Sequence, residues 1–175
     1  DNNLEENTLV IFLSDNGGHE ASISLPLRGK KATYWEGGLR VPFCAQWKGV
    51  IPAGVTYSDP VISLDILPTL VTAAGGKIDS EWQLDGVDLM PFITGQKKAA
   101  PHDALYWVWG ARKAIRQGDL KAITENEGNT WHLYNLRKDL AEENDLAAIR
   151  PEKLKELIDR HQQWEKDLTP QQWGW

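Results

Sequence analysis

The chain has 175 residues, enough for a domain that buries its own hydrophobic core. Its 19 basic residues against 25 acidic ones give a formal net charge of −6, which excludes a nucleic-acid backbone as the main partner. No apolar stretch is long enough to span a membrane, and the single cysteine, Cys44, excludes a disulfide framework.

The first predicted strand, residues 8–13, is an uninterrupted apolar run that leads directly into Asp15, Asn16 and two glycines. Such a run is typical of a parallel sheet buried on both faces, and ligands of these sheets collect at the carboxyl ends of the strands. The carboxylate of Asp15 and the amide of Asn16 offer oxygen donors suited to Ca²⁺ or Mg²⁺. The same residues also fit an ordinary turn, so a cation site and a turn both stay open at this point.

Residues 14–38 form a long glycine-rich loop, and the usual reason for ordering such a loop is a site. A second strand is predicted over residues 39–47, followed by a helix over residues 64–74. This helix carries one apolar face, made of Leu64, Leu67, Leu70, Val71 and Ala74.

The pattern changes near residue 100, after which short apolar runs alternate with turn residues. They predict four closely spaced strands, at residues 105–109, 112–117, 120–124 and 131–135. Apolar residues at helical spacing predict a last helix over residues 151–168. We therefore predict an α/β chain with two domains. Residues 1–100 are part of a large α/β domain, and residues 101–175 form a small four-stranded antiparallel sheet with a C-terminal helix.

Several segments carry a recognisable order of motifs. They are residues 14–18 (Ser-Asp-Asn-Gly-Gly), 27–42 with Glu-Gly-Gly-Leu-Arg at 36–40, 63–70, 84–89, 114–121, 133–136 and 143–147. In this order they resemble the formylglycine-dependent sulfatases, the arylsulfatase family of the alkaline-phosphatase-like superfamily, over nearly the whole chain. The resemblance implies that residues 1–100 are the C-terminal part of a sulfatase catalytic domain, in an enzyme that hydrolyses sulfate esters.

The resemblance also implies the chemistry of the site. A divalent cation, with Ca²⁺ favoured over Mg²⁺, polarises the sulfate while a formylglycine acts as nucleophile. Asp15 and Asn16 correspond to metal ligands, and Asn16 also lies near the ester. Lys31 corresponds to the catalytic lysine that contacts sulfate, with Lys30 as its competitor. His19, just after the glycines, is a further candidate for substrate binding.

Two more expectations concern the loop and the nucleophile. Glu36 and Arg40 are expected to form a buried ion pair that braces the loop. The family's nucleophile lies in a Cys-x-Pro-x-Arg segment, and Cys44 is followed by Ala45 and Gln46 and does not match it. We therefore expect the formylglycine to lie outside this chain, the chain alone to be inactive and its uncovered strands to self-associate. The full-length enzyme is expected in the periplasm or outside the cell.

Two other functions stay open. A phosphoester hydrolase of the same superfamily shares oxygen-ligated metals, whereas a Cys- or Ser-x-Pro-x-Arg segment in the complete gene favours a sulfatase. A non-catalytic module could instead bind a glycan or a partner through the small sheet, whose Trp107 and Trp109 belong to a chain with nine tryptophans. For the enzyme, the substrate is a sulfated small molecule or glycan. The resemblance does not identify this substrate. Many relatives place a polar residue, often histidine, near Val108 to Gly110, so the contacts to the leaving group are expected to differ here.

Overall fold

The computed structural model describes residues 2–19, 21–126 and 130–169, and it divides into two compact units. The first unit joins Asp1–Asp15 to Pro42–Asp103, and the second joins Asn16–Val41 to Ala104–Trp175. Residues 16–41 thus group with the predicted small sheet, although they fall within the range assigned to the first domain. The division at residue 100 into two domains stays a prediction. No helix in the described part of the chain is long and apolar enough to cross a bilayer.

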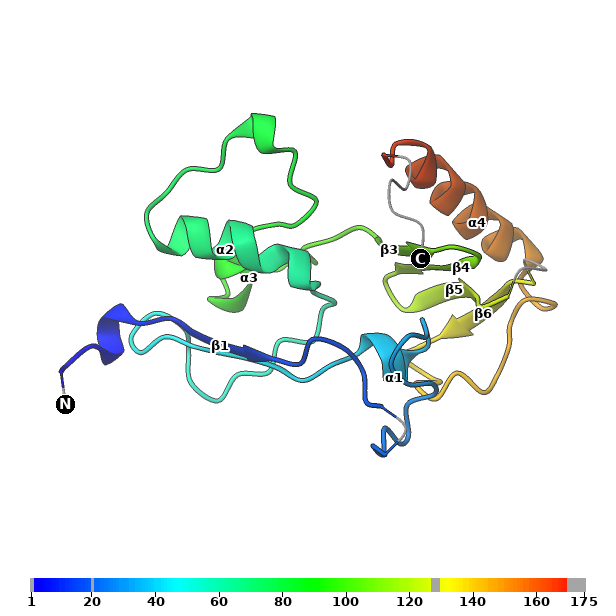
Figure 1. Ribbon diagram of the computed structural model, residues 1–175, viewed down its shortest axis with the longest axis horizontal. Coiled ribbons are helices and arrows are strands. Elements are labelled where there is room, and N and C mark those ends of the chain that lie inside the picture. The colour runs from blue at the N-terminus through cyan, green and yellow to red at the C-terminus, as the bar shows by residue number, and fades with distance from the viewer. Residues whose placement is uncertain (1, 20, 127–129, 170–175) are drawn as a thin grey trace. The chain divides into compact units, whose positions relative to one another are not determined.

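The first unit contains a two-stranded ribbon covered by short helices (Figure 1). Its elements are η1 (Glu5–Asn7), β1 (Val10–Leu13), β2 (Phe43–Gln46), η2 (Ser63–Asp65), α2 (Ile66–Ala73), η3 (Ser80–Trp82) and α3 (Met90–Ile93). β1 pairs with β2 in antiparallel register, with Val10 opposite Gln46 and Leu13 opposite Phe43. The expected parallel arrangement is therefore wrong for this pair, because the long loop between the strands brings β2 back beside β1.

The predicted burial of β1 on both faces is also wrong for the chain as it stands. Val10 and Phe12 are exposed, whereas Ile11 and Leu13 on the other face are partly buried. The ribbon buries only the face that turns toward α2 and α3. An all-apolar sequence hides this alternation, because both faces carry the same kind of side chain.

Helix α2 turns its polar residues inward. The predicted apolar face is largely exposed at Leu64, Leu67 and Leu70, while Asp65 and Thr69 are buried. The physical reason is a hydrogen-bond network: the Asp65 carboxylate accepts from the backbone N–H groups of residues 62 and 87, and the Thr69 hydroxyl accepts from that of residue 89. Buried polar atoms with partners cost little, so the network fixes which side of the helix faces the interior.

The second unit is a sheet with a layer on each face. Strands β3 (Leu105–Trp109), β4 (Arg112–Gln117), β5 (Leu120–Thr124) and β6 (His132–Asn135) pair antiparallel in sequence order, so the prediction of a four-stranded antiparallel sheet is confirmed. Helix α4 (Pro151–Lys166) packs Leu157 on one face, beside Ile115, Ala122 and Leu133. The other face carries Ala114, Ile123 and Tyr134 and is covered by Tyr34 and Trp35 of the loop. Figure 1 shows α4 and the short helix α1 (Glu36–Leu39) beside this sheet.

Candidate functional site

The loop of residues 16–41 is fastened across one face of the sheet at several points. The backbone N–H of Tyr34 donates to Glu125 Oε1 at 2.5 Å, and Arg112 on β4 donates to the carbonyl of Ala32 at 2.6 Å. Burial, reinforced by the negative charge of Glu125, raises the pKa of Tyr34 to about 12. Tyr34 is therefore a neutral packing residue at physiological pH. The bonds at Ala32 and Tyr34 therefore attach the segment of Lys30 and Lys31 to the sheet from its C-terminal side.

Three glycines allow separate stretches of this loop to meet. A Cβ added to Gly38 would overlap the carbonyl oxygen of Thr33, and one added to Gly17 would overlap the carbonyl oxygen of Gly37. The N–H of Gly17 donates to the carbonyl of Gly38 at 3.1 Å, and that of Gly37 donates to Arg28 at 2.6 Å. Only glycine permits backbones to approach this closely. The Gly-Gly pairs of the sequence are thus explained by loop packing as well as by turning.

Lys31 returns to the beginning of the loop. Its backbone N–H donates to the carbonyl of Gly18 at 2.8 Å. The side chains of Lys30 and Lys31 are both exposed, so burial does not choose between the two lysines. The structure therefore brings the predicted sulfate-contacting lysine to the turn that follows Asn16, and its catalytic role stays a prediction.

Asp15 and Asn16 are neighbours in the sequence that belong to different units. Asp15 follows β1 at the end of the first unit, and its carboxylate is exposed. Asn16 opens the second unit, is partly buried and donates from Nδ2 to the carbonyl of Gly17 at 3.2 Å. Within the described residues, no group of three or more His, Cys, Asp or Glu side chains is arranged to hold a metal ion. The oxygen donors of Asp15 and Asn16 suit a hard cation, and their role as metal ligands stays a prediction.

His19 lies on the exposed side of the same turn. Its carbonyl accepts hydrogen bonds from the backbone N–H of Ser22 at 2.9 Å and from the Ser22 hydroxyl at 2.6 Å. These bonds shape a turn that begins at His19. The role of His19 in substrate binding stays a prediction.

Glu36 has a different partner from the one expected. Its carboxylate is buried and lies 2.8 Å from Nζ of Lys121 on β5, whereas Arg40 is exposed and bonds Glu36 only through its backbone. The predicted Glu36–Arg40 ion pair is therefore wrong, because the loop packs on a sheet whose interior already carries a lysine. The sequence signal for this partner is Lys121 itself. It lies on the same face of its strand as the buried Ile123, where a lysine needs a carboxylate partner.

Arg28 is part of the loop's attachment. Ser24 to Arg28 has the letters Ser-x-Pro-x-Arg, the serine version of the nucleophile pattern. In the structure the Arg28 guanidinium lies 3.7 Å from the ring centre of Trp35 and donates to the carbonyl of Glu142 at 3.0 Å. This cation–π contact and hydrogen bond hold the loop to the sheet unit. The structure therefore gives Arg28 an anchoring role.

Exposed polar and aromatic side chains of the sheet lie on the same face as the loop. Trp109 at the end of β3 is 50% exposed, and the Arg112 guanidinium lies 5.2 Å from its ring centre. His132 on β6 lies 2.7 Å from the Asp145 carboxylate, and both side chains are about one-third exposed. Partial burial acts to raise the pKa of Asp145, but hydrogen bonds from the Leu133 backbone N–H, the His132 side chain and the Ala147 backbone N–H together lower it.

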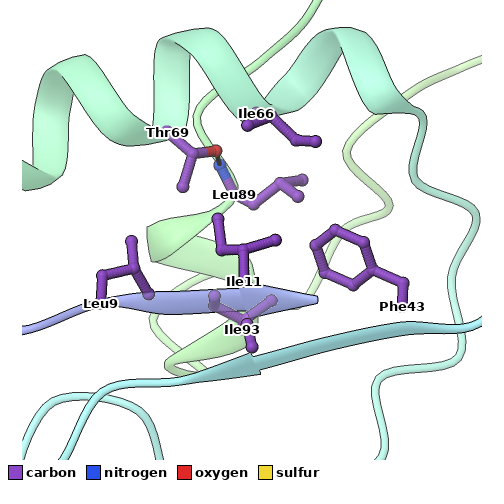
Figure 2. Close-up of a pocket in the computed structure, with 8 residues that line it drawn as sticks. Leu9, Ile11, Phe43, Ile66, Thr69, Leu89 and Ile93 are labelled. Carbon is purple, nitrogen blue, oxygen red and sulfur yellow. Dashed lines mark hydrogen bonds between the residues drawn. The ribbon is translucent and has the colours of Figure 1, made fainter. Parts of the chain in front are cut away.

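A small cavity in the first unit is not a ligand site. Figure 2 shows its side chains pointing toward one another between the ribbon, α2 and α3. Its volume is about 10 Å³, which at most admits one water molecule. The lining consists of Leu9, Ile11, Phe43, Ala45, Ile66, Thr69, Leu89 and Ile93. We assign it to core packing.

Comparisons with known proteins agree with this architecture. The family model described as Sulfatase matches residues 1–76. A protein named Sulfatase from Formosa agariphila is 33% identical over 166 residues, which cover 85% of this chain and 30% of that protein. Human steryl-sulfatase is 35% identical over 113 residues, which cover 59% of this chain and 19% of that enzyme.

A solved structure extends the match to nearly the whole chain. The crystal structure of Ps i-CgsB in complex with k-i-k-neocarrahexaose superposes with a TM-score of 0.86 at 31% identity. The superposition covers 98% of this chain and 39% of that one. The chain thus spans less than two-fifths of each of these three relatives. Sequence and structure together show that the chain belongs to the sulfatase family.

Proposed function

We propose that this chain supplies one side of an active site that hydrolyses sulfate esters. The observation that carries the proposal is the return of Lys31 to the turn after Asn16, held by the Lys31–Gly18 hydrogen bond. This backbone bond supports the proposal because it joins the segment of Lys31 to the turn of Asn16, within one loop of the second unit. The family membership supports the same reaction class.

The proposed division of labour follows from charge. A divalent cation, when bound by Asp15 and Asn16, polarises the sulfuryl oxygens. We favour Ca²⁺ over Mg²⁺, because the donors are a carboxylate and a neutral amide, and Ca²⁺ accepts six to eight such oxygens in flexible geometry. Lys31 stabilises negative charge on the sulfate or on the departing ester oxygen. His19 contributes to substrate binding at the edge of the turn, and a formylglycine supplies the nucleophile.

Hydrolysis by the full-length protein tests this proposal. We expect it to hydrolyse an aryl sulfate in the presence of Ca²⁺ or Mg²⁺ and to act poorly on the matching aryl phosphate. Lys31→Ala should lower kcat by about 10²-fold, as loss of one group that stabilises transition-state charge does. Lys30→Ala tests the competing lysine, and Lys138→Ala, at an exposed lysine after β6, is the control. A preference for the phosphate ester would favour the phosphoester hydrolase instead.

We further infer that the substrate is a sulfated saccharide. The exposed indole of Trp109 offers a flat apolar surface of the kind on which a sugar ring stacks. Arg112 contacts this ring and also donates to the carbonyl of Ala32, the residue after Lys31. One guanidinium therefore links the exposed ring to the lysine loop. The carbohydrate complex named for the i-CgsB structure supports the same class of substrate.

Comparison of two substrates tests the role of Trp109. Trp109→Ala should raise KM for a sulfated oligosaccharide by about tenfold, as expected when one aromatic contact is lost, and leave KM for a small aryl sulfate unchanged. Trp109→Phe should retain most of the affinity. An equal effect on both substrates would contradict stacking on a sugar. Metal-independent binding of sulfated glycans without hydrolysis would instead favour a binding module.

A further inference from the structure

A buried cluster of three charged side chains lies between the loop and the sheet. Nζ of Lys121 on β5 is 2.8 Å from Oε1 of Glu36 on α1 and 2.9 Å from Oε1 of Glu142, which follows β6. The Lys121 and Glu142 side chains are completely buried, and that of Glu36 is 4% exposed. Arg116 adds a second cation 3.8 Å from Glu36.

Each charge in this cluster depends on the others. Removing an ion from water is costly unless it is paired, and two carboxylates this close require a cation between them. Glu142 also accepts the backbone N–H of Glu36 through Oε2 at 2.7 Å. Glu36 is therefore fixed twice, by its carboxylate and by its backbone.

Gly37 and Gly38, directly after Glu36, pack against several other stretches of the loop. Gly37 accommodates Arg28 and Gly29 so closely that a Cβ would lie 2.6 and 2.5 Å from their carbonyl oxygens. Gly38 accepts the N–H of Gly17, the residue after Asn16. A Cβ on Gly38 would also lie 2.6 Å from the carbonyl oxygen of Lys30.

A continuous set of contacts therefore runs from Lys121 to both candidate site residues. It passes through Glu36 to Gly38, and from there to Gly17 beside Asn16 and to Lys30 beside Lys31. The other polar attachments of the loop use more exposed groups: Arg112 at Ala32, Glu125 at Tyr34, and Arg28, which donates to the carbonyl of Glu142. Among these described attachments, only the ion pairs of Lys121 join side chains that are almost completely buried.

We infer that Lys121 is a positioning residue, which holds Asn16 and Lys31 in place through the Glu36–Glu142 carboxylate pair. The inference rests on the proposed function for the role of those two residues. Lys121 itself is buried under the loop and takes no part in binding substrate.

We call the ion pairs of Lys121 with Glu36 and Glu142 the clamp. Hydrogen exchange on the full-length protein tests the clamp without any activity measurement. Lys121→Met removes the central cation at similar length. The amides of Gly17, Lys31 and Gly37 should then exchange at least about tenfold faster, because Glu142 loses its cation and Glu36 keeps only Arg116 at 3.8 Å. The strand amides of Ala122 and Ile123 should keep their protection. Equal loss of protection in loop and strands would show a purely structural role and overturn the inference.

A matched control exists on the neighbouring strand. Lys113 on β4 pairs with Glu165 of α4 at 2.8 Å, on the opposite face of the sheet. Lys113→Met should affect the exchange of α4 amides and leave Lys31 unchanged. If Lys121→Met does not fold, the triple variant with Glu36→Gln and Glu142→Gln removes the repelling charges. It should fold and still show fast exchange in the loop, whereas retained loop protection in this variant would contradict the clamp.

Kinetics separates the clamp from the proposed function. In Lys121→Met, kcat for an aryl sulfate should fall by about tenfold or more while the exchange of the strands is unchanged, since misplaced groups lose transition-state contacts. Lys121→Arg should restore part of this loss. Normal kcat with fast loop exchange would overturn the positioning role. An inactive wild-type protein with the expected exchange pattern would leave the clamp standing and refute the proposed function.

Discussion

Lys31 and Gly18 are joined by a backbone hydrogen bond of 2.8 Å, which folds the lysine segment back onto the turn after Asn16. This contact spans the loop and depends on close backbone packing at Gly17, Gly37 and Gly38. Specific contacts therefore hold the loop in one conformation, and substitutions inside it are expected to shift the residues of the candidate site.

A methyl group at Gly38 should disturb the lysine segment. In Gly38→Ala the new Cβ overlaps the Thr33 carbonyl, and overpacking of this kind costs about 1–3 kcal/mol of unfolding free energy. Denaturant titration measures the loss, and hydrogen exchange at the Lys31 amide locates it. Gly118→Ala is the control: its φ of +56° is strained but its surroundings are open, so it should cost about 1 kcal/mol and leave Lys31 unchanged.

Acid should weaken the docking of α4 through His161. This side chain is fully buried, its Nε2 donates to the carbonyl of Trp107 at 3.0 Å, and burial lowers its pKa from the ordinary 6.5. Glu165 at 3.6 Å opposes that shift, and Lys113 reinforces it. The folded chain therefore binds a proton less readily than the unfolded chain. Unfolding free energy is insensitive to this group well above pH 6.5 and falls as the pH drops through 6.5 toward the lower folded-state pKa.

The comparison of wild type with His161→Gln isolates this effect. The amide of glutamine can keep the bond to Trp107 but does not titrate. Denaturant titrations between pH 7 and 5 should show a smaller decrease of stability in the variant, since about one titrating group has been removed. Parallel slopes in the two proteins would contradict the assignment to His161.

The 175-residue chain by itself should bind Ca²⁺ or Mg²⁺ only weakly. Asp15 and Asn16 provide two side-chain ligands, whereas Ca²⁺ takes about six to eight oxygens and Mg²⁺ six. Calorimetric titration should therefore give no submicromolar affinity for either ion. Asp15→Asn, which removes the charge, should abolish the residual binding, and tight binding that survives it would place the metal elsewhere.

The 175-residue chain should also self-associate through the first unit. Phe12 is 66% exposed on the ribbon, and Leu64 and Leu67 are each 53% exposed beside and on α2. Exposed apolar surface next to an unprotected strand edge favours association. Light scattering coupled to size exclusion should show species larger than a monomer. The variant with Phe12→Ser, Leu64→Gln and Leu67→Gln should reduce these larger species. A wild-type chain that is a monodisperse monomer at high concentration would refute the prediction.

The small sheet was determined by local sequence. Alternating residues and the turn at Gly118 and Asp119 predict β4 and β5 at their observed bounds, and helical spacing predicts α4 to within two residues of its end. Each strand pairs with the next one along the chain, so short-range signals suffice to specify the register. The order of motifs is also a property of the sequence alone, and it predicts Asp15, Asn16 and Lys31 as site residues.

Only the tertiary structure decided the direction of the β1–β2 pair, the inward side of α2 and the partner of Glu36. All three depend on groups that are distant in the sequence: the returning loop, the hydrogen bonds from residue 87 to Asp65, and Lys121, which lies 85 positions after Glu36. A local pattern shows that a charge is present but not which distant charge neutralises it. Burial makes that pairing obligatory, because an unpaired ion in the interior costs more free energy than the fold can supply.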